Sequence, residues 1–415
     1  MTTSWLDLPA DHPFGLATLP YGVFSTTDPD LRRVGVRVGD LVLDAGMAAE
    51  FVGNHPGESG IAWLQPSLNH FLSLGRPAWE AARAWLIEML SNPAHRDGIE
   101  PYLIRLEEVT LHLPIEVADY VDFYASENHA TNIGRIFRPD DEALTPNWRH
   151  LPIGYHGRAG TVVVSGTDIT RPKGQRRSPT DPAPVFGPSI KLDIEAEIAF
   201  IVGGCTRLGS RVEVDDAAEH LFGVALFNDW SARDIQAWEY VPLGPFLGKS
   251  FGSSLGAWVV PMEALEAARV PLARQDPEPL PYLRSSVANG AGTGLFGLDL
   301  QLEVRINGTL VSSPPYAGMY WSPAQMLAHL TVNGASLRDG DLFASGTISG
   351  STKDSRGSLM ELTWNGQQPL TLDDGSTRAF LQDGDTVTVS GWAPGTDGRR
   401  VGLGEVVGRV LPALP

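Results

Sequence analysis

Cysteine, positive charge and long hydrophobic runs are all scarce in this sequence. Cys205 is the only cysteine among 415 residues, which excludes a disulfide within the chain and suits a reducing compartment. The 31 Lys and Arg residues are outnumbered by 49 Asp and Glu, and the net charge of −18 argues against nucleic acid or an anionic membrane as a partner. No apolar run approaches the length of a membrane span, and residues 1–14 lack the basic and apolar regions of a signal peptide. We therefore expect a cytoplasmic protein.

Glycine and proline, by contrast, are frequent and spread along the chain, with 45 and 32 residues. This composition favours many short strands joined by tight turns. Before about residue 118 the sequence predicts a hairpin that turns at Gly39-Asp40 and a helix over 77–90 that opens with a proline. These elements indicate a small N-terminal domain over residues 1–118.

From about residue 119 onward, short alternating segments dominate, including 222–228, 300–306 and 360–366. The Asn-Gly pairs at 307–308 and 365–366 predict hairpin turns. We therefore expect a mainly β (α+β) protein, in which a larger β domain occupies residues 119–415.

The segment 190–202 reads I-K-L-D-I-E-A-E-I-A-F-I-V and alternates with the period of a strand that has one buried face. Its other face carries Asp193, Glu195 and Glu197, whose carboxylates lie roughly 7 Å apart along a strand and repel one another. Two interpretations stay open at this point: a solvated sheet face, or a bound cation.

A second polar stretch, residues 119–132, brings together Asp122, Tyr124 and His129. We expect it to be irregular. Each of these residues taken alone is more often structural or merely exposed than functional.

A helix predicted over 231–240 places Arg233, Gln236 and Tyr240 at i, i+3 and i+7, on one face. This face offers a cation, an amide and a phenol suited to gripping a carboxylate or keto acid, although a solvated helix face fits the same pattern. Asp229, at the end of the preceding strand, is either the helix N-cap or a site residue.

Two stretches resemble catalytic or phosphate-binding motifs, but one lacks the required secondary structure and the other lacks the required spacing. The stretch G-K-S-F-G at 248–252 fits the nucleophile elbow with Ser250, but prolines precede it and a predicted strand follows where a helix is required. The stretch 244–250 has three residues between its glycines, where a phosphate-binding loop has four. A glycine-rich loop that carries Lys249 close to Asp229 remains.

Taken together, these segments resemble the fumarylacetoacetate hydrolase family, whose members hydrolyse a carbon–carbon bond. The resemblance implies a small SH3-like barrel for residues 1–118 and a mixed β-sandwich or roll for the catalytic part. The matching stretches run in order along the chain: D-F-Y-A-S-E-N-H-A-T-N (122–132), N-W-R-H-L-P-I-G-Y-H-G-R (147–158), L-D-I-E-A-E-I-A-F (192–200), 228–252, 332–350 and 383–391.

The same resemblance implies a metal site. An all-carboxylate shell suits a hard cation such as Ca²⁺ or Mg²⁺. Asp193 matches the family sequence but is not a ligand, and Ser253 stands where family members usually have Thr. The implied calcium ligands are Asp122, Glu195, Glu197 and Asp229. The implied magnesium-type position involves Asp229, Lys249 and Ser253.

The implied reaction is hydrolysis of 4-fumarylacetoacetate to fumarate and acetoacetate, in tyrosine and phenylalanine catabolism, by a homodimer. His129 would act as general base, oriented by Glu361, with the divalent cation as Lewis acid and template. The neighbouring Glu127-Asn128 differ from the Arg-Gln of animal members. The implied oxyanion contacts are Arg233, Gln236 and Lys249. The implied substrate contacts are Tyr124, Arg138, Tyr155, Gln236, Tyr240 and Thr347.

Two alternatives remain on sequence grounds. A related hydrolase of another β-diketo or acylpyruvate acid would share the metal and differ in the Arg138, Tyr155 and Tyr240 contacts. A non-catalytic, metal-stabilised β protein would leave His129 and Glu361 without a role.

Overall fold

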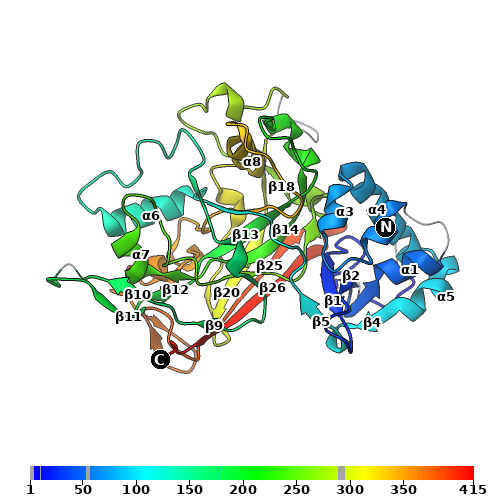
Figure 1. Cartoon of the computed structure of the whole chain (residues 1–415), viewed down its shortest axis with the longest axis horizontal. Coiled ribbons are helices and arrows are strands. Elements are labelled where there is room, and N and C mark those ends of the chain that lie inside the picture. Colours follow the sequence, from blue (N-terminus) through cyan, green and yellow to red (C-terminus); the bar gives the residue numbers. More distant parts are fainter. Residues whose placement is uncertain (1–3, 10, 53–56, 179, 288–294) are drawn as a thin grey trace.

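The structure, a computed structural model, describes the chain except for residues 1–3, 10, 53–56, 179 and 288–294. The N-terminal part forms an antiparallel sheet in the order β4-β3-β2-β1-β5. It lies at one end of the molecule, blue and cyan in Figure 1. Its strands are β1 (Tyr21–Ser25), β2 (Arg33–Val38), β3 (Leu41–Asp44), β4 (Leu103–Arg105) and β5 (Thr110–His112). Its helices are α1 (Ala45–Phe51), α2 (Glu58–Ala62), α3 (Asn69–Ser73), α4 (Arg76–Ser91) and α5 (Arg96–Ile99).

Both local predictions for the N-terminal part are confirmed. Strands β2 and β3 form the hairpin, with Gly39 at φ 61°, a conformation that glycine adopts without strain. Helix α4 covers the predicted helix and has its proline in the first turn, where a missing N–H costs nothing.

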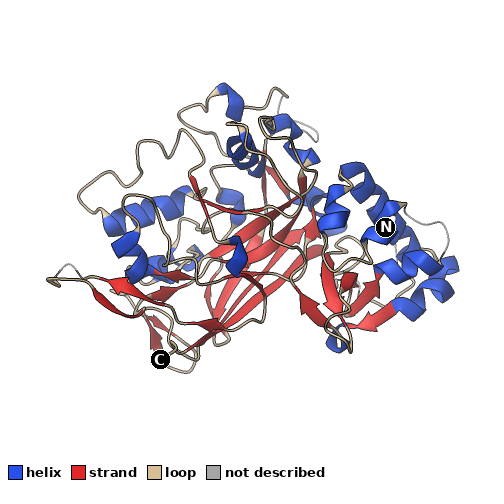
Figure 2. Ribbon diagram, in the orientation of Figure 1, coloured by secondary structure: helices blue, strands red, loops and turns tan. Residues whose placement is uncertain are grey.

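The C-terminal part contains two large sheets, whose long strands cross the middle of the molecule with helices around them (Figure 2). The first has the order β7-β6-β22-β13-β14-β16-β8, with β17 also paired to β14, and the second has the order β21-β20-β25-β26-β9. The first comprises β6 (Tyr120–Phe123), β7 (Gly154–His156), β8 (Val162–Val164), β13 (Ala196–Val202), β14 (Leu221–Asn228), β16 (Ser253–Leu255), β17 (Val260–Pro261) and β22 (Leu342–Ala344). The second comprises β9 (Ile169–Thr170), β20 (Gln301–Ile306), β21 (Thr309–Ser312), β25 (Thr386–Pro394) and β26 (Arg400–Leu411).

Short strand pairs and, among the described residues, four helices complete this part, and the expected mainly β (α+β) fold is confirmed. None of the helices in the described ranges has both the length and the hydropathy to span a membrane. The helices are α6 (Glu127–Phe137), α7 (Arg233–Glu239), α8 (Pro323–Thr331) and α9 (Leu359–Leu362). The short pairs are β10 (Lys173–Arg176) with β11 (Val185–Pro188), β12 (Leu192–Asp193) with β15 (Ser231–Ala232), β18 (Arg269–Pro271) with β19 (Phe296–Leu298), and β23 (Leu370–Thr371) with β24 (Thr377–Arg378).

The two parts share a hydrophobic core along β14. The ring of Phe222 contacts the rings of Tyr21, Phe71 and Trp79 at centroid distances of 5.5, 5.7 and 5.2 Å. Burial of a Phe side chain contributes about 1.5–3 kcal/mol. The N-terminal sheet and helices therefore pack against the sheet that carries the site described below and stabilise it.

The segment 190–202 differs from the predicted strand with one buried face. It is divided into β12 and β13, and every residue from Leu192 to Val202 is buried. Ile198 and Phe200 pack into one core cluster, while Ala199 and Ile201 pack into the other. The solvated sheet face is therefore wrong, because both faces of β13 are covered.

Two further expectations are wrong because serine caps start helices there. Residues 119–132 are ordered as β6 and α6, whose N-cap Ser126 accepts a hydrogen bond from the His129 N–H at 3.3 Å. The strand expected over 360–366 begins instead as helix α9, capped by Ser358, and the pair at 365–366 follows this helix instead of closing a hairpin. The pair at 307–308 does close the hairpin between β20 and β21.

Candidate active site

Four buried carboxylates converge where several strands end. Asp122 lies in β6, Glu197 in β13, Glu195 in the break before β13, and Asp229 directly after β14. One oxygen of each lies within 4.8 Å of the others. Asp229 is not a helix N-cap, since α7 begins at Arg233 and Ala232 occupies the capping position.

Sheet register brings these acids together. In the antiparallel pair β13–β14, Ala196 is opposite Asn228, so the residues beside them, Glu195 and Asp229, meet at the same end. Strand β22 lies between β13 and β6 and pairs with β6 in parallel, with Ala344 opposite Asp122. The alternation that is visible in the sequence thus becomes a site only through strand order.

Two cations lie beside the acids. Lys249 Nζ donates to Asp229 Oδ2 at 2.6 Å and also contacts Glu195, and Arg233 Nη1 lies 2.7 Å from Glu195 Oε1. Ser253 Oγ donates to Asp229 Oδ1 at 2.8 Å, and the Tyr155 hydroxyl donates to Asp229 Oδ2 at 3.3 Å. Despite burial, Asp229 and Glu195 raise the pKa of Lys249, so it stays an ammonium.

Three of the acids have pKa values shifted in different directions because their neighbours differ. Burial alone would raise the pKa of Glu195, but the charges of Arg233 and Lys249 hold it well below its usual range. Burial, followed by repulsion from the other acids, raises the pKa of Asp122 and of Glu197 well above the usual range.

These acids fit a hard divalent cation. Asp122 Oδ1 and Glu197 Oε1 are buried and have no hydrogen-bond partner among the residues that the structure describes. A buried carboxylate oxygen without a partner is costly unless a charge neutralises it. An oxygen-only donor set is what Ca²⁺ and Mg²⁺ prefer.

The predicted histidine–glutamate pair is formed. His129 Nδ1 lies 2.6 Å from Glu361 Oε2, although 232 residues separate the two in sequence. Ser349 Oγ and Ser358 Oγ donate to the same oxygen at 2.9 and 2.8 Å, and Asn132 Nδ2 donates to the other oxygen at 2.9 Å. Burial would raise the pKa of Glu361, but the interaction with His129 and the hydrogen bonds from Asn132 and Ser358 lower it, so the side chain is a carboxylate.

A cavity of about 480 Å³ joins the two groups. Its volume lies in the range of small-molecule sites. Arg233 Nη2 and Thr347 Oγ1 are buried there without a hydrogen-bond partner in the described part of the chain. The predicted site residues that line the cavity are Asp122, Tyr124, His129, Arg138, Tyr155, Glu195, Arg233, Gln236, Tyr240, Lys249 and Thr347. The predicted residues that lie behind this lining are Glu197, Asp229, Ser253 and Glu361.

Sequence reasoning missed Asn132, Ser349 and Ser358, the three side chains that hold Glu361. Asn132 lies three residues after His129 on α6, so a helix prediction for this stretch would have put both on one face. Ser349 carries no local signal, whereas Ser358 begins the S-x-x-E pattern that marks a helix start and ends at Glu361. Arg233 is more constrained than predicted, because Asp193 and Glu195 already bind it.

Comparison with known families agrees with this arrangement. A family model described as fumarylacetoacetate (FAA) hydrolase C-terminal matches residues 119–411, and one described as fumarylacetoacetase N-terminal matches residues 17–114. The chain belongs to the fumarylacetoacetate hydrolase family. The predicted family is thereby confirmed.

Curated members of this family are similar over their full length. The chain is 47% identical over 423 residues to fumarylacetoacetase of Homo sapiens and 46% identical over 426 residues to that of Arabidopsis thaliana, with 99% of each chain covered. Among solved structures, fumarylacetoacetate hydrolase from Exiguobacterium antarcticum has a TM-score of 0.55 at 19% identity and covers 95% of this chain and 99% of its own. At that identity the likeness concerns the fold alone.

Proposed function

We propose that this enzyme hydrolyses 4-fumarylacetoacetate to fumarate and acetoacetate, a step of tyrosine and phenylalanine catabolism. The observation that carries the proposal is the buried His129–Glu361 pair, which meets the acid cluster at one cavity. The full-length similarity to curated fumarylacetoacetases supports this substrate over another diketo acid.

The His129–Glu361 pair supplies the general base. Because the Glu361 carboxylate accepts the Nδ1–H of His129, Nε2 is left to take a proton from water. The water oxygen attacks the carbonyl carbon of the fumaryl group, and the bond from this carbon to the methylene of the acetoacetate part breaks. Fumarate leaves with the new oxygen, and the methylene takes a proton to give acetoacetate. The buried Glu361 stabilises the imidazolium between these steps.

The attack places negative charge on the ketone oxygen. Arg233, Gln236 and Lys249 line the cavity as donors for it, and Arg233 Nη2 is a buried donor without a hydrogen-bond partner among the described residues. The proposed contacts to the rest of the substrate are Tyr124, Arg138, Tyr155, Gln236, Tyr240 and Thr347. Arg138 suits a terminal carboxylate by its charge.

The cofactor of this proposal is Ca²⁺ or Mg²⁺, held by Asp122, Glu195, Glu197 and Asp229. The magnesium-type position involves Asp229, Lys249 and Ser253, where the Lys249 ammonium would lie beside the cation as a donor to Asp229 and not as a ligand. The hydroxyl of Ser253 hydrogen-bonds Asp229, as a threonine hydroxyl would. When bound, such a cation supplies Lewis-acid stabilisation of the carbanion leaving group. We further propose a cytoplasmic homodimer, with the domain division after residue 118.

The alternative, a hydrolase of another β-diketo or acylpyruvate acid, is separated from this proposal by an assay. Purified enzyme is given fumarylacetoacetate or an acylpyruvate, loss of the diketone absorbance is followed, and the products are identified by NMR. We expect fumarate and acetoacetate in equal amounts and a higher kcat/KM for fumarylacetoacetate. Turnover of the acylpyruvate alone would assign the alternative.

A further inference from the structure

Asp193 is a buried acid that the proposed mechanism does not use. It has no exposed surface, and it lies at the end of β12, immediately before the break that turns Glu195 toward the acid cluster. Its partner strand is β15, with Ser231 opposite it. The carboxylate is therefore fixed on the same strand pair that leads into α7.

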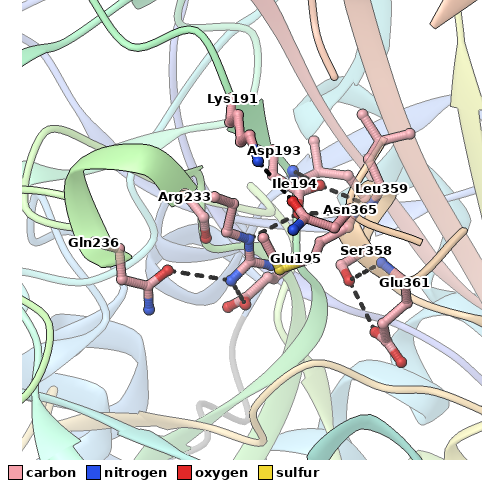
Figure 3. A network of polar contacts seen from close by, with 12 residues as sticks. Lys191, Asp193, Ile194, Glu195, Arg233, Gln236, Ser358, Leu359, Glu361 and Asn365 are labelled. Carbon is pink, nitrogen blue, oxygen red and sulfur yellow. Dashed lines mark hydrogen bonds and ion pairs between the residues drawn. The ribbon is translucent and has the colours of Figure 1, made fainter. Parts of the chain in front are cut away.

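Four donors saturate this carboxylate (Figure 3). Oδ1 accepts the backbone N–H groups of Ile194 and Leu359, both at 2.7 Å. Oδ2 accepts Arg233 Nε at 2.8 Å and the backbone N–H of Met360 at 3.0 Å. Asp193 thus joins the cation of α7 to the first turn of α9.

Both partners lead directly to the chemistry. Arg233, held at Nε, directs Nη1 to Glu195, and its side chain lines the cavity. Helix α9 carries Glu361 one residue after Met360, and Glu361 binds His129. One carboxylate therefore fixes the separation between the oxyanion-binding cation and the general base.

We propose that Asp193 is a positioning residue that holds Arg233 and the His129–Glu361 pair in register across the cavity. Its carboxylate is suited to this role because a charged acceptor binds three backbone donors and a guanidinium at once, which a neutral amide cannot do. The inference rests on the proposed hydrolysis. Turnover by the wild-type enzyme tests the hydrolysis, and the variants below test Asp193.

The test is Asp193→Asn, with Asp385→Asn as a matched control. Asp385 is also buried, and it binds Arg378 Nε at 2.8 Å and the Gln382 N–H at 2.8 Å, but none of these residues lines the cavity. A purely structural role predicts the same outcome for both: lower thermal stability with kcat retained. We expect kcat to fall about 10–100-fold in Asp193→Asn only, with KM changed less than about threefold and bound metal retained.

A double-mutant cycle with Glu361→Gln measures the coupling. Asp193→Asn in the Glu361→Gln background should lower kcat by less than it does in the wild type, because Glu361 no longer orients the base. Unchanged kcat in Asp193→Asn, or fully multiplying effects, would overturn the proposal.

Asp193→Glu is measured in the same way if the asparagine variant does not fold. It keeps the charge but displaces the carboxylate by one methylene, so we expect a loss of kcat here too. Failure of both variants to fold while Asp385→Asn folds would assign Asp193 to stability alone and overturn the proposal.

Discussion

His129 and Glu361 lie 232 residues apart in sequence and form a 2.6 Å contact that is almost fully buried. If they act as base and orienter, His129→Ala and Glu361→Gln should each lower kcat by roughly 10²–10⁴-fold, the usual contribution of general base catalysis. The double variant should be little worse than His129→Ala, because an orienter has no effect once the base is gone. Steady-state kinetics and metal analysis check this, with metal content expected to be unchanged.

Ser250→Ala is the control at the same scale. Ser250 precedes β16 instead of a helix and does not line the cavity, so most activity should remain. A loss on the order of 10⁴-fold would identify a nucleophile and revive the serine-hydrolase motif.

For the histidine–glutamate pair, effects of His129→Ala and Glu361→Gln that multiply in the double variant would show that Glu361 has another role.

The candidate site residues could be predicted to different degrees. The acids of 193–197 are visible as an alternating run, but alternation alone cannot tell that Asp193 turns to α9 while Glu195 and Glu197 meet Asp122. That difference comes from the break between β12 and β13. Glu361 was found through the family resemblance, since no local pattern connects it with His129.

At the scale of elements, serine caps position the catalytic side chains. Ser126 begins α6, which carries His129, while Ser322 begins α8, none of whose residues lines the cavity. Each N-cap serine contributes about 1 kcal/mol to the free energy of unfolding. We expect Ser126→Ala and Ser322→Ala to lose similar stability in denaturant unfolding, whereas only Ser126→Ala loses kcat. Equal kcat values would mean that α6 is held in place without its cap.

The carboxyl group of Asp341, in the turn before β22, should make the stability of the protein depend on pH. Burial raises the pKa of Asp341 to about 6, although the Arg338 N–H donates to it at 2.8 Å. The pKa of an aspartate in the unfolded chain is about 3.9, so the folded state binds the proton more tightly than the unfolded state. The free energy of unfolding therefore rises as the pH falls through 6 and decreases as the pH rises through 6. The melting temperature of wild type minus that of Asp341→Asn should therefore increase from about pH 7.5 to about pH 5.

Asp385→Asn is the control for this pH dependence. Burial would raise the pKa of Asp385, but the hydrogen bonds from Arg378, Gln382 and Asn307 lower it. Its contribution is therefore present above the unfolded pKa and lost only as the pH falls through the lower folded value. The corresponding difference in melting temperature should stay flat over the same window. A flat difference for Asp341→Asn as well would contradict the assigned shift.

The prediction of helices and strands from the sequence failed where a capping side chain determines the backbone conformation. The hairpin at Gly39 and the helix at 76–91 follow from turn chemistry and amphipathic spacing, and both are present. The segment 360–366 alternates like a strand, yet Ser358 and Asp193 bind the first N–H groups of α9 and favour a helix. The Ser358 cap lies in a local S-x-x-E pattern, but the contribution of Asp193, which is 166 residues from Leu359, cannot be read from a local pattern.

At the scale of the whole molecule, the N-terminal part supports the site from behind. Phe222 of β14 packs among N-terminal aromatic rings, and the same strand ends beside Asp229. The chain order and sheet order together explain why acids from three distant segments converge. The net charge of −18 adds repulsion that a bound cation would relieve locally.

Metal removal tests the central claim most directly. The enzyme is stripped exhaustively with a chelator, metal content is measured, and fumarylacetoacetate hydrolysis is followed before and after addition of Mg²⁺ or Ca²⁺. Without the cation, the carbanion leaving group loses its Lewis-acid stabilisation, so turnover should be abolished in the stripped enzyme and restored by either ion. Full activity in metal-free, folded protein would contradict the account.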